Sequence, residues 1–210
     1  MIVAKLFYKF GPMSSSKSLR LLTTAYDLEQ KGINIMVLKP SVDNRDGEEV
    51  IRSRAGLERE CVSFGQNVNL YKAIKAYRNV LAAQLKSLVW VIIDECQFLT
   101  EQQVTQLSDV VDFLDVNVMC FGLRTDFQSK LFPGSKRLFE IADDIEEIKS
   151  TCECGERKAS INARFDSNGD VVVDGEQVMI GGDEKYRAIC RKCWKEKIRE
   201  QAMRENNTEL

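Results

Sequence analysis

A short segment near the N-terminus combines a glycine, small hydroxyl side chains and a lysine at a spacing that could bind phosphate groups. In chain order, its residues are Gly11, Pro12, Met13, Ser14, Ser15, Ser16, Lys17 and Ser18. An apolar strand pattern precedes the segment and a helical pattern follows it, so backbone N–H groups at the helix start could surround a phosphate. Lys17 would reach the β- and γ-phosphates, and the Ser18 hydroxyl would bind Mg²⁺. The segment therefore predicts a P-loop for Mg-ATP, and the alternative is a polar turn that caps a helix.

One position of this loop departs from the usual P-loop pattern. Ser16 stands where that pattern has its second glycine. If the position needs a positive φ, serine costs about 1 kcal/mol there. This cost is small enough for the phosphate-binding interpretation to stand.

Two adjacent acidic residues follow the most apolar strand pattern of the chain. Residues 89–93 form a continuous β-branched and aromatic run, typical of a buried strand, and Asp94 and Glu95 come directly after it. Asp94 would hold Mg²⁺ beside the P-loop, directly or through water. Glu95 could accept a proton from an attacking hydroxyl group. The alternative is a strand that ends in two solvated acids, which the P-loop pattern upstream disfavours.

Four of the seven cysteines form two close pairs, Cys152-x-Cys154 and Cys190-x-x-Cys193. Four thiolates on short loops can surround a zinc ion completely, as in structural zinc sites. The first pair is spaced more tightly than the usual Cys-x-x-Cys, and free thiols are the alternative. The remaining cysteines are scattered and are expected to pack as small apolar residues: Cys61, Cys96 and Cys120.

The composition excludes several classes of protein. With a formal net charge of -2, the chain has no general attraction to nucleic acid or to membranes. It contains no histidine, so proton transfer must use Asp, Glu, Lys, Tyr, Cys or water, and His-dependent triads are excluded. No apolar stretch is long enough to span a bilayer, and the first residues show no cleavable signal. We therefore expect a cytoplasmic protein that binds neither nucleic acid nor membrane.

The alternation of apolar patterns predicts an α/β fold. The chain opens with a strand at 2–8, a helix at 19–30 and a strand at 33–38, which indicates a βαβ unit with a right-handed crossover. Further helices are expected at 70–85, 101–114 and 132–142, and further strands at 89–93, 116–121 and 145–148. Residues 39–65 are polar and are expected to form a long loop with a weak strand near 55–62. The whole predicts a P-loop (RecA-like), mostly parallel sheet with flanking helices.

The character of the chain changes after Ser150. Residues 161–165 and 171–173 alternate around Ser167-Asn168-Gly169-Asp170, a strong hairpin signal. A charged helix follows the second cysteine pair. We therefore expect a P-loop domain at 1–150, a small zinc-binding domain at 151–195 and a C-terminal helix and tail at 196–210.

Several more motifs occur in a distinctive order. Beside the P-loop they are Lys39-Pro40 with Asp43-Asn44-Arg45, Asp94-Glu95-Cys96-Gln97-Phe98, Gly122-Leu123-Arg124-Thr125-Asp126-Phe127, Phe132-Pro133-Gly134-Ser135, and Ile180-Gly181-Gly182-Asp183-Glu184-Lys185-Tyr186 ahead of the second cysteine pair. From Met1 to about Lys195 the chain resembles the thymidine kinases of the type shared by bacteria, some large DNA viruses and animal cytosol. Each motif is modest evidence alone, whereas the ordered set is highly specific.

The resemblance implies transfer of the γ-phosphate of Mg-ATP to the 5′-hydroxyl of thymidine, and of deoxyuridine. It assigns Glu95 as the base that removes the hydroxyl proton. It also implies a structural zinc ion, a homotetramer, and feedback inhibition by the triphosphate end product, dTTP.

The resemblance also carries substrate contacts over by position. Leu123, Phe127 and Phe132 would line the base pocket, with Phe127 stacking on thymine. On spacing alone, core packing is the better interpretation of the two phenylalanines. A "lasso" over the nucleoside and a segment near the sugar and phosphates supply the remaining contacts: Met179, Ile180 and Gly181 with the supporting Tyr186, and Asp43 with Arg45.

Two alternatives belong to other functional classes. Asp94-Glu95-Cys96-Gln97 is also similar to the Asp-Glu box of P-loop ATPases and helicase-like motors, in which the glutamate activates water. The chain is too short for the two motor domains of a helicase. A zinc-ribbon module for nucleic acid is the second alternative, and the acidic net charge argues against it.

Overall fold

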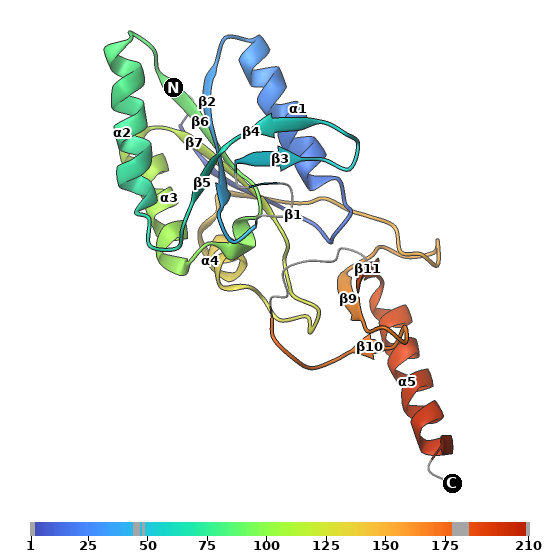
Figure 1. Ribbon diagram of the computed structural model, residues 1–210. Coiled ribbons are helices and arrows are strands. Elements are labelled where there is room, and N and C mark those ends of the chain that lie inside the picture. Colours follow the sequence, from blue (N-terminus) through green and yellow to red (C-terminus); the bar gives the residue numbers. More distant parts are fainter. Residues whose placement is uncertain (1–2, 44–46, 48, 178–184, 209–210) are drawn as a thin grey trace.

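The computed structural model describes residues 3–43, 47, 49–177 and 185–208. Figure 1 shows an α/β body around one large sheet, and a smaller C-terminal part that ends in a long helix. No helix among these residues has the length and apolar character needed to cross a membrane.

The large sheet has six parallel strands in the order β5-β2-β6-β7-β1-β8. In chain order they are β1 (Leu6–Phe10), β2 (Asn34–Pro40), β5 (Val62–Phe64), β6 (Leu88–Ile93), β7 (Asn117–Gly122) and β8 (Asp144–Glu147). The predicted parallel sheet is confirmed. Since all strands run in the same direction, the loops that follow β1, β2, β6 and β7 meet at one edge of the sheet, where α/β proteins bind ligands.

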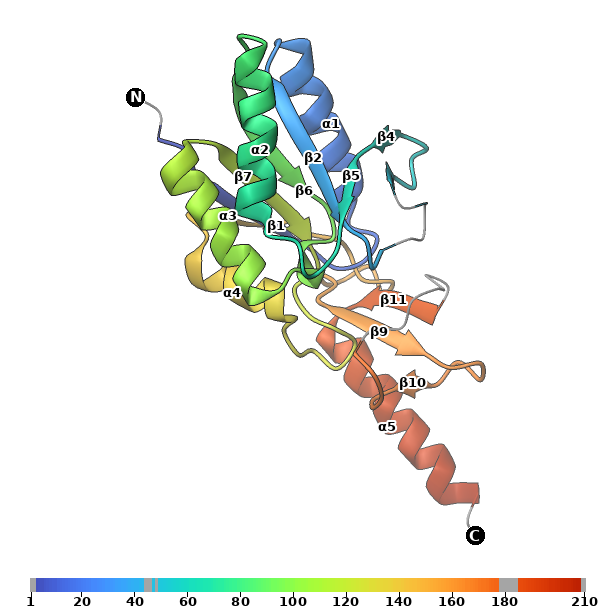
Figure 2. The same cartoon turned by 60° about the vertical axis from the view of Figure 1, so that its left-hand side comes forward.

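Helices cover both faces of this sheet, as Figures 1 and 2 show. They are α1 (Lys17–Gln30), α2 (Leu70–Ala83), α3 (Glu101–Leu114) and α4 (Pro133–Ile141). Ile92 of β6 packs in the core that α1 covers, whereas its neighbours Val91 and Ile93 pack in the core of α2, α3 and α4. This alternation follows from the two-residue period of a strand. It explains why β6 reads as a continuous apolar run.

The start of α3 forms as the sequence predicts. The Thr100 side chain accepts a hydrogen bond from the backbone of Gln103, and the Gln103 side chain accepts one from the backbone of Thr100. This capping box satisfies two backbone donors at the helix start. It fixes the point at which the chain leaves the turn that follows β6.

The long loop expected at residues 39–65 is interrupted by short strands, one of which lies within the weak strand expected near 55–62. These residues contain an antiparallel hairpin of β3 (Val50–Arg52) and β4 (Glu58–Glu60), and β5 then adds to the edge of the large sheet beside β2. Ile51 is buried and packs in the α1 core. Each of these short strands buries few side chains, which leaves little apolar periodicity to detect.

The C-terminal part is built on a second, three-stranded sheet in the order β10-β9-β11. The predicted hairpin is confirmed as β9 (Ile161–Phe165) paired with β10 (Val171–Val172), but β11 (Tyr186–Ile189) was not predicted. The final helix, α5 (Arg191–Thr208), begins before residue 196 and therefore lies partly in the segment expected to bind zinc. Figure 2 shows α5 running alongside the second sheet, against which Trp194 and Ile198 pack, and then extending beyond it.

The contact between α4 and the turn after β6 leaves no space for a side chain at Gly134. A Cβ atom there would lie 2.6 Å from the carbonyl oxygen of Cys96 and 2.7 Å from that of Leu99. We therefore expect Gly134→Ala to lower the free energy of unfolding by about 1–3 kcal/mol, measured by urea denaturation. Lys136→Ala, at an exposed position of the same helix, should change it by less than about 0.5 kcal/mol. Equal stability of the two variants would show that α4 can shift without cost.

Candidate active site

A cavity of about 480 Å³ lies at the edge of the large sheet where β1, β2, β6 and β7 end. Its volume falls within the usual range for small-molecule sites. The predicted P-loop residues 13–18 line one part of it, and aromatic side chains line another part. Residues 50–55 of the β3–β4 hairpin line a further part, and the second sheet contributes Asn162 of β9 and Tyr186 of β11. Both parts of the molecule therefore build this one site.

The P-loop has the conformation expected of a phosphate-binding turn. Ser16 has a φ of 63°, in the left-handed region that the glycine of the usual pattern favours. A Cβ atom at Gly11 would lie 2.5 Å from the carbonyl oxygen of Ile148, so only glycine fits there. The Ser15 hydroxyl is buried and has no hydrogen-bond partner among the described residues. A buried hydroxyl without a protein partner could donate a hydrogen bond to a phosphate oxygen.

The P-loop lysine and serine lie next to the end of β6. Lys17 is buried and donates to the carbonyl oxygen of Pro12 at 2.8 Å. The Ser18 hydroxyl donates to Asp94 Oδ2 at 3.0 Å. The P-loop and the acidic residue that was predicted to share a metal ion with it are therefore in direct contact.

Asp94 is a buried carboxyl group beside a second acid. Burial, followed by the neighbouring charge of Glu95, raises the pKa of Asp94 to about 7. The backbone N–H of Glu95, at 3.0 Å from Oδ1, and the hydroxyl of Ser18 donate to the carboxylate and lower its pKa. A bound cation would favour the ionised form in the same way.

Glu95 lines the cavity and has an unusual backbone conformation. Its φ of 49° and ψ of 39° place it in the left-handed region, just before the 3-10 turn η1 (Cys96–Phe98). Gln97 of this turn donates from Nε2 to Glu95 Oε2. Uncommon backbone conformations of this kind cluster at functional sites.

The three residues predicted for the base pocket all line the cavity. Phe132 is buried and makes an edge contact with Phe98, with 6.0 Å between ring centroids. Phe127 is also buried, and the guanidinium carbon of Arg164 lies 3.7 Å from its ring centroid. This geometry is a cation–π contact on one face of the ring. Leu123, which follows β7, completes the group.

Other predicted contacts are only partly within the described residues. Asp43 is buried and lines the cavity, with its Oδ2 3.8 Å from the Nζ of the buried Lys39. Tyr186 also lines the cavity. The remaining predicted residues lie outside the described residues: Arg45, Met179, Ile180 and Gly181.

The second sheet is tied to the P-loop body by side-chain hydrogen bonds. Asn162 is buried, and its Oδ1 accepts from the backbone N–H of Met13 at 2.7 Å. Its Nδ2 donates to the carbonyl oxygen of Thr125 at 3.1 Å. Gln177 donates to Asp126 Oδ2 at 2.9 Å. One amide group of β9 thus contacts both the P-loop and the segment that leads to the aromatic side chains.

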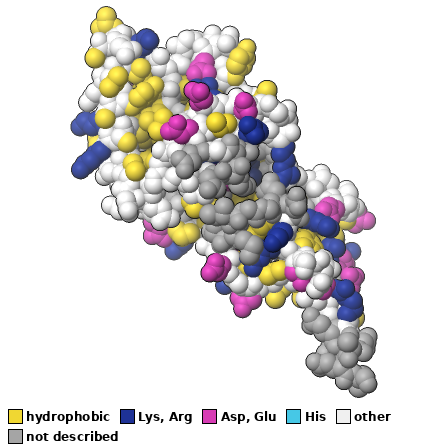
Figure 3. All heavy atoms as spheres, viewed as in Figure 1, with side chains coloured by type: hydrophobic (Ala, Val, Ile, Leu, Met, Phe, Trp, Pro, Cys, Tyr) yellow, Lys and Arg dark blue, Asp and Glu magenta, His cyan; other side chains and the backbone are white. Residues whose placement is uncertain are grey.

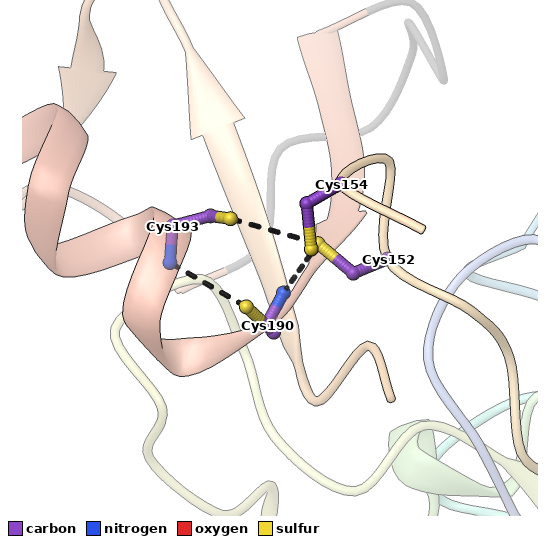
Figure 4. Close-up of side chains that lie close together, drawn as sticks. All are labelled: Cys152, Cys154, Cys190 and Cys193. Carbon is purple, nitrogen blue, oxygen red and sulfur yellow. Dashed lines mark hydrogen bonds between the residues drawn. The ribbon is translucent and has the colours of Figure 1, made fainter. Parts of the chain in front are cut away.

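The four paired cysteines converge beside the second sheet (Figure 4). Their sulfur atoms all lie within 4.8 Å of one another, and Cys152 Sγ is 3.9 Å from Cys193 Sγ. In a tetrahedral zinc–thiolate site, zinc–sulfur bonds of about 2.3 Å imply sulfur–sulfur distances of about 3.8 Å. The backbone N–H of Cys190 donates to Cys152 Sγ at 3.1 Å, and that of Cys193 donates to Cys190 Sγ at 3.5 Å. The cluster therefore fits a zinc ion with four protein ligands.

The fold and the site define a class of protein. A P-loop in contact with an acidic strand end, opening into a cavity with an aromatic wall, is the site of a nucleotide-dependent phosphotransferase. The family model for thymidine kinase matches residues 4–194. The chain therefore belongs to the thymidine kinase family, so it is an ATP-dependent nucleoside kinase whose reaction is the phosphorylation of thymidine.

Curated relatives agree with the family match over nearly the whole chain. A thymidine kinase of Mannheimia succiniciproducens is 45% identical over 93% of this chain and 97% of its own length. One of Rhodopirellula baltica is 44% identical, over 95% of this chain and 92% of its own length. One of Escherichia coli O157:H7 is 42% identical, over 93% of each chain. A Pif1 helicase of Candida albicans matches 70% of this chain and 36% of its own with a TM-score of 0.42 and 17% identity, which is too weak to bear on function.

Several residues that line the cavity, or that contact its lining, were not predicted as site residues. Gln97 and Thr125 belong to motifs that carried the family resemblance, so a signal for them was present. Asn162 and Arg164 lie in the short strand β9, whose sequence contains no recognisable functional motif. Their roles depend on contacts with Thr125 and Phe127, each 37 positions away. Only the packing of the two sheets brings these side chains into the site.

Loss of the Asn162 amide should loosen the P-loop. Asn162→Ala leaves the Met13 N–H and the Thr125 carbonyl without these partners, which should lower the free energy of unfolding by about 1–3 kcal/mol. Hydrogen exchange of the peptide that contains Met13 should become faster. Asn168→Ala, in the exposed turn of the hairpin, is the control. If exchange near Met13 is the same in both variants, Asn162 does not hold the P-loop.

Proposed function

We propose that Glu95 is the general base of thymidine phosphorylation and that the P-loop binds the phosphates of ATP. The supporting observation is that a single cavity contains Lys17, the acidic end of β6, and the aromatic side chains of Phe127 and Phe132. The charged part suits a triphosphate, and the aromatic part suits a flat pyrimidine. The two substrates would therefore occupy the same cavity, ATP in its charged part and thymidine in its aromatic part.

The reaction needs a base, correct positioning and stabilisation of charge. Glu95 accepts the 5′-hydroxyl proton as that oxygen attacks the γ-phosphorus. The new oxygen–phosphorus bond forms while the bond between the γ-phosphorus and the bridging oxygen breaks, which gives thymidine monophosphate and ADP. Lys17 and the N–H groups of the P-loop stabilise the negative charge on the phosphate oxygens. Holding the two substrates in line supplies much of the remaining acceleration.

Ser18 and Asp94 would hold the magnesium ion of Mg-ATP. A hydroxyl and a carboxylate oxygen are ligands that Mg²⁺ prefers, and here they lie 3.0 Å apart beside the P-loop. When bound, Mg²⁺ supplies positive charge next to the β- and γ-phosphates. The ionised form of Asp94 is the form that would bind it.

The base contacts follow from the aromatic part of the cavity. Arg164 covers one face of Phe127, so thymine would contact the rest of that ring together with Phe132 and Leu123. Asp43 would lie near the sugar and phosphates. The expected contacts of the lasso and of the segment near the phosphates remain predictions: Met179, Ile180, Gly181 and Arg45.

A structural zinc ion bound by the four paired cysteines completes the proposal. Cys152 and Cys154 lie in the loop before β9, and Cys190 and Cys193 lie at the start of α5. The ion would therefore join this loop to the helix. Four protein ligands leave no open position for a substrate. The ion would therefore stabilise the sheet that supplies Asn162.

Finer properties rest on the family resemblance. They are phosphorylation of deoxyuridine, inhibition by dTTP, a cytoplasmic location and a homotetramer. Apolar side chains are exposed on the α2 side of the body (Figure 3), among them Tyr77, Val80 and Leu85. Exposed apolar surface of this kind is typical of subunit contacts.

Phosphate transfer from Mg-ATP tests the base. We expect Glu95→Gln to lower kcat for thymidine by about 10²- to 10⁴-fold, with nucleotide binding largely unchanged because the side chain keeps its size and loses only the charge. Glu140→Gln, on the surface of α4, is the matched control and should keep normal turnover. Turnover near normal in Glu95→Gln would remove Glu95 from the base role. ATP loss without nucleoside, measured in parallel, would favour the motor-like alternative.

Removal of one thiolate tests the zinc site. Cys190→Ser should lose stoichiometric zinc, measured by elemental analysis, and should melt at a lower temperature, because zinc binding contributes directly to folding in such sites. Cys61→Ser changes a cysteine that packs beside the large sheet, and this variant should retain one zinc per chain. Full zinc content in Cys190→Ser would contradict the four-cysteine site.

A further inference from the structure

The buried side-chain amide of Gln97 lies between the Glu95 carboxylate and the end of β7. Its side chain is 1% exposed, yet it lines the cavity two residues after Glu95. Its Nε2 donates to Glu95 Oε2, and its Oε1 accepts from the backbone N–H of Leu123 at 2.9 Å. Both ends of the amide are therefore engaged by groups of the site.

The direction of this hydrogen-bond chain is determined by chemistry. A backbone N–H can only donate, so the amide oxygen of Gln97 must face Leu123. The NH₂ group must then face Glu95, and a carboxylate is an acceptor that matches it. No flipped arrangement satisfies both partners.

The surrounding backbone is shaped to admit this amide. A Cβ atom at Gly122 would lie 2.6 Å from Gln97 Oε1 and 2.6 Å from Cys96 Sγ. On the other side, Gly134 allows α4 to approach the same turn closely. The turn η1 is thus held between the end of β7 and the start of α4, and Gln97 has little freedom to move.

Glu95 needs such a support. Its side chain starts from a left-handed backbone conformation and follows Asp94, whose negative charge repels it. A donor that engages one carboxylate oxygen sets the plane of the carboxyl group and keeps it directed into the cavity.

We propose that Gln97 is a positioning residue that orients the Glu95 carboxylate for proton removal, using the Leu123 N–H as its anchor. This inference rests on the proposed role of Glu95 as the base. We expect a loss of kcat with little change in substrate binding, because Gln97 acts on the Glu95 carboxylate and not on either substrate.

Two substitutions separate this role from a purely structural one. Gln97→Met has a similar length and loses both hydrogen bonds. Gln97→Glu keeps the acceptor for the Leu123 N–H and loses the donor that faces Glu95. If Gln97 orients the base, both variants should lower kcat by about 10- to 100-fold, with KM for ATP and for thymidine within about threefold of the normal values. If Gln97 only anchors Leu123, Gln97→Glu should keep kcat within about twofold, and the inference would be wrong.

A double-mutant cycle distinguishes failure of this inference from failure of the base assignment. Gln97→Met in a Glu95→Gln background should lower kcat by less than about threefold further, since the group that it positions is already absent. A full additional loss would show that Gln97 acts independently of Glu95 and would overturn the inference. Normal turnover of Glu95→Gln alone would instead overturn the base assignment. Gln102→Met, at an exposed position of α3, is the matched control and should keep normal kinetics and stability.

Discussion

Two carboxyl groups stand side by side directly after the fully buried end of β6, and the site is organised around the repulsion between them. Asp94 is almost removed from solvent, which alone makes its charged form unfavourable, and Glu95 adds a second negative charge. A buried carboxyl group binds a metal only in its ionised form, so nearby hydrogen-bond donors and cations must stabilise that form. The hydroxyl of Ser18 and the backbone N–H of Glu95 supply the donors.

This constraint explains the close approach of the P-loop to β6. The loop brings Lys17 and the helix start of α1 to the acidic strand end, and both contribute positive potential. The same positive potential attracts phosphate, so the groups that stabilise Asp94 would also form the proposed binding site for ATP. A cation and a polyphosphate bound together would therefore offset the repulsion between the two carboxylates.

The sequence allowed much of this arrangement to be predicted, because the relevant patterns are local. The P-loop, the acidic pair and the cysteine pairs each occupy a few consecutive residues after or before a strong apolar pattern. β11, Asn162 and Arg164 could not be found in that way. β11 is four residues long and pairs with β9 across more than twenty residues, and Arg164 gains its meaning only from Phe127. The strand β3 was missed for a related reason. Ile51 is its only buried apolar residue, and a single residue produces no alternation of apolar and polar positions.

The P-loop serine shows why a motif is better understood as a set of conformations than as a set of letters. Ser16 replaces the usual glycine and still adopts the left-handed conformation, with a cost of about 1 kcal/mol. At Gly11 the requirement is different, because a side chain there would collide with the Ile148 carbonyl oxygen. A strained conformation can be supported by the tertiary structure around it, whereas an occupied volume cannot be shared. The glycine of this loop that is kept is therefore the one whose space is already filled by backbone.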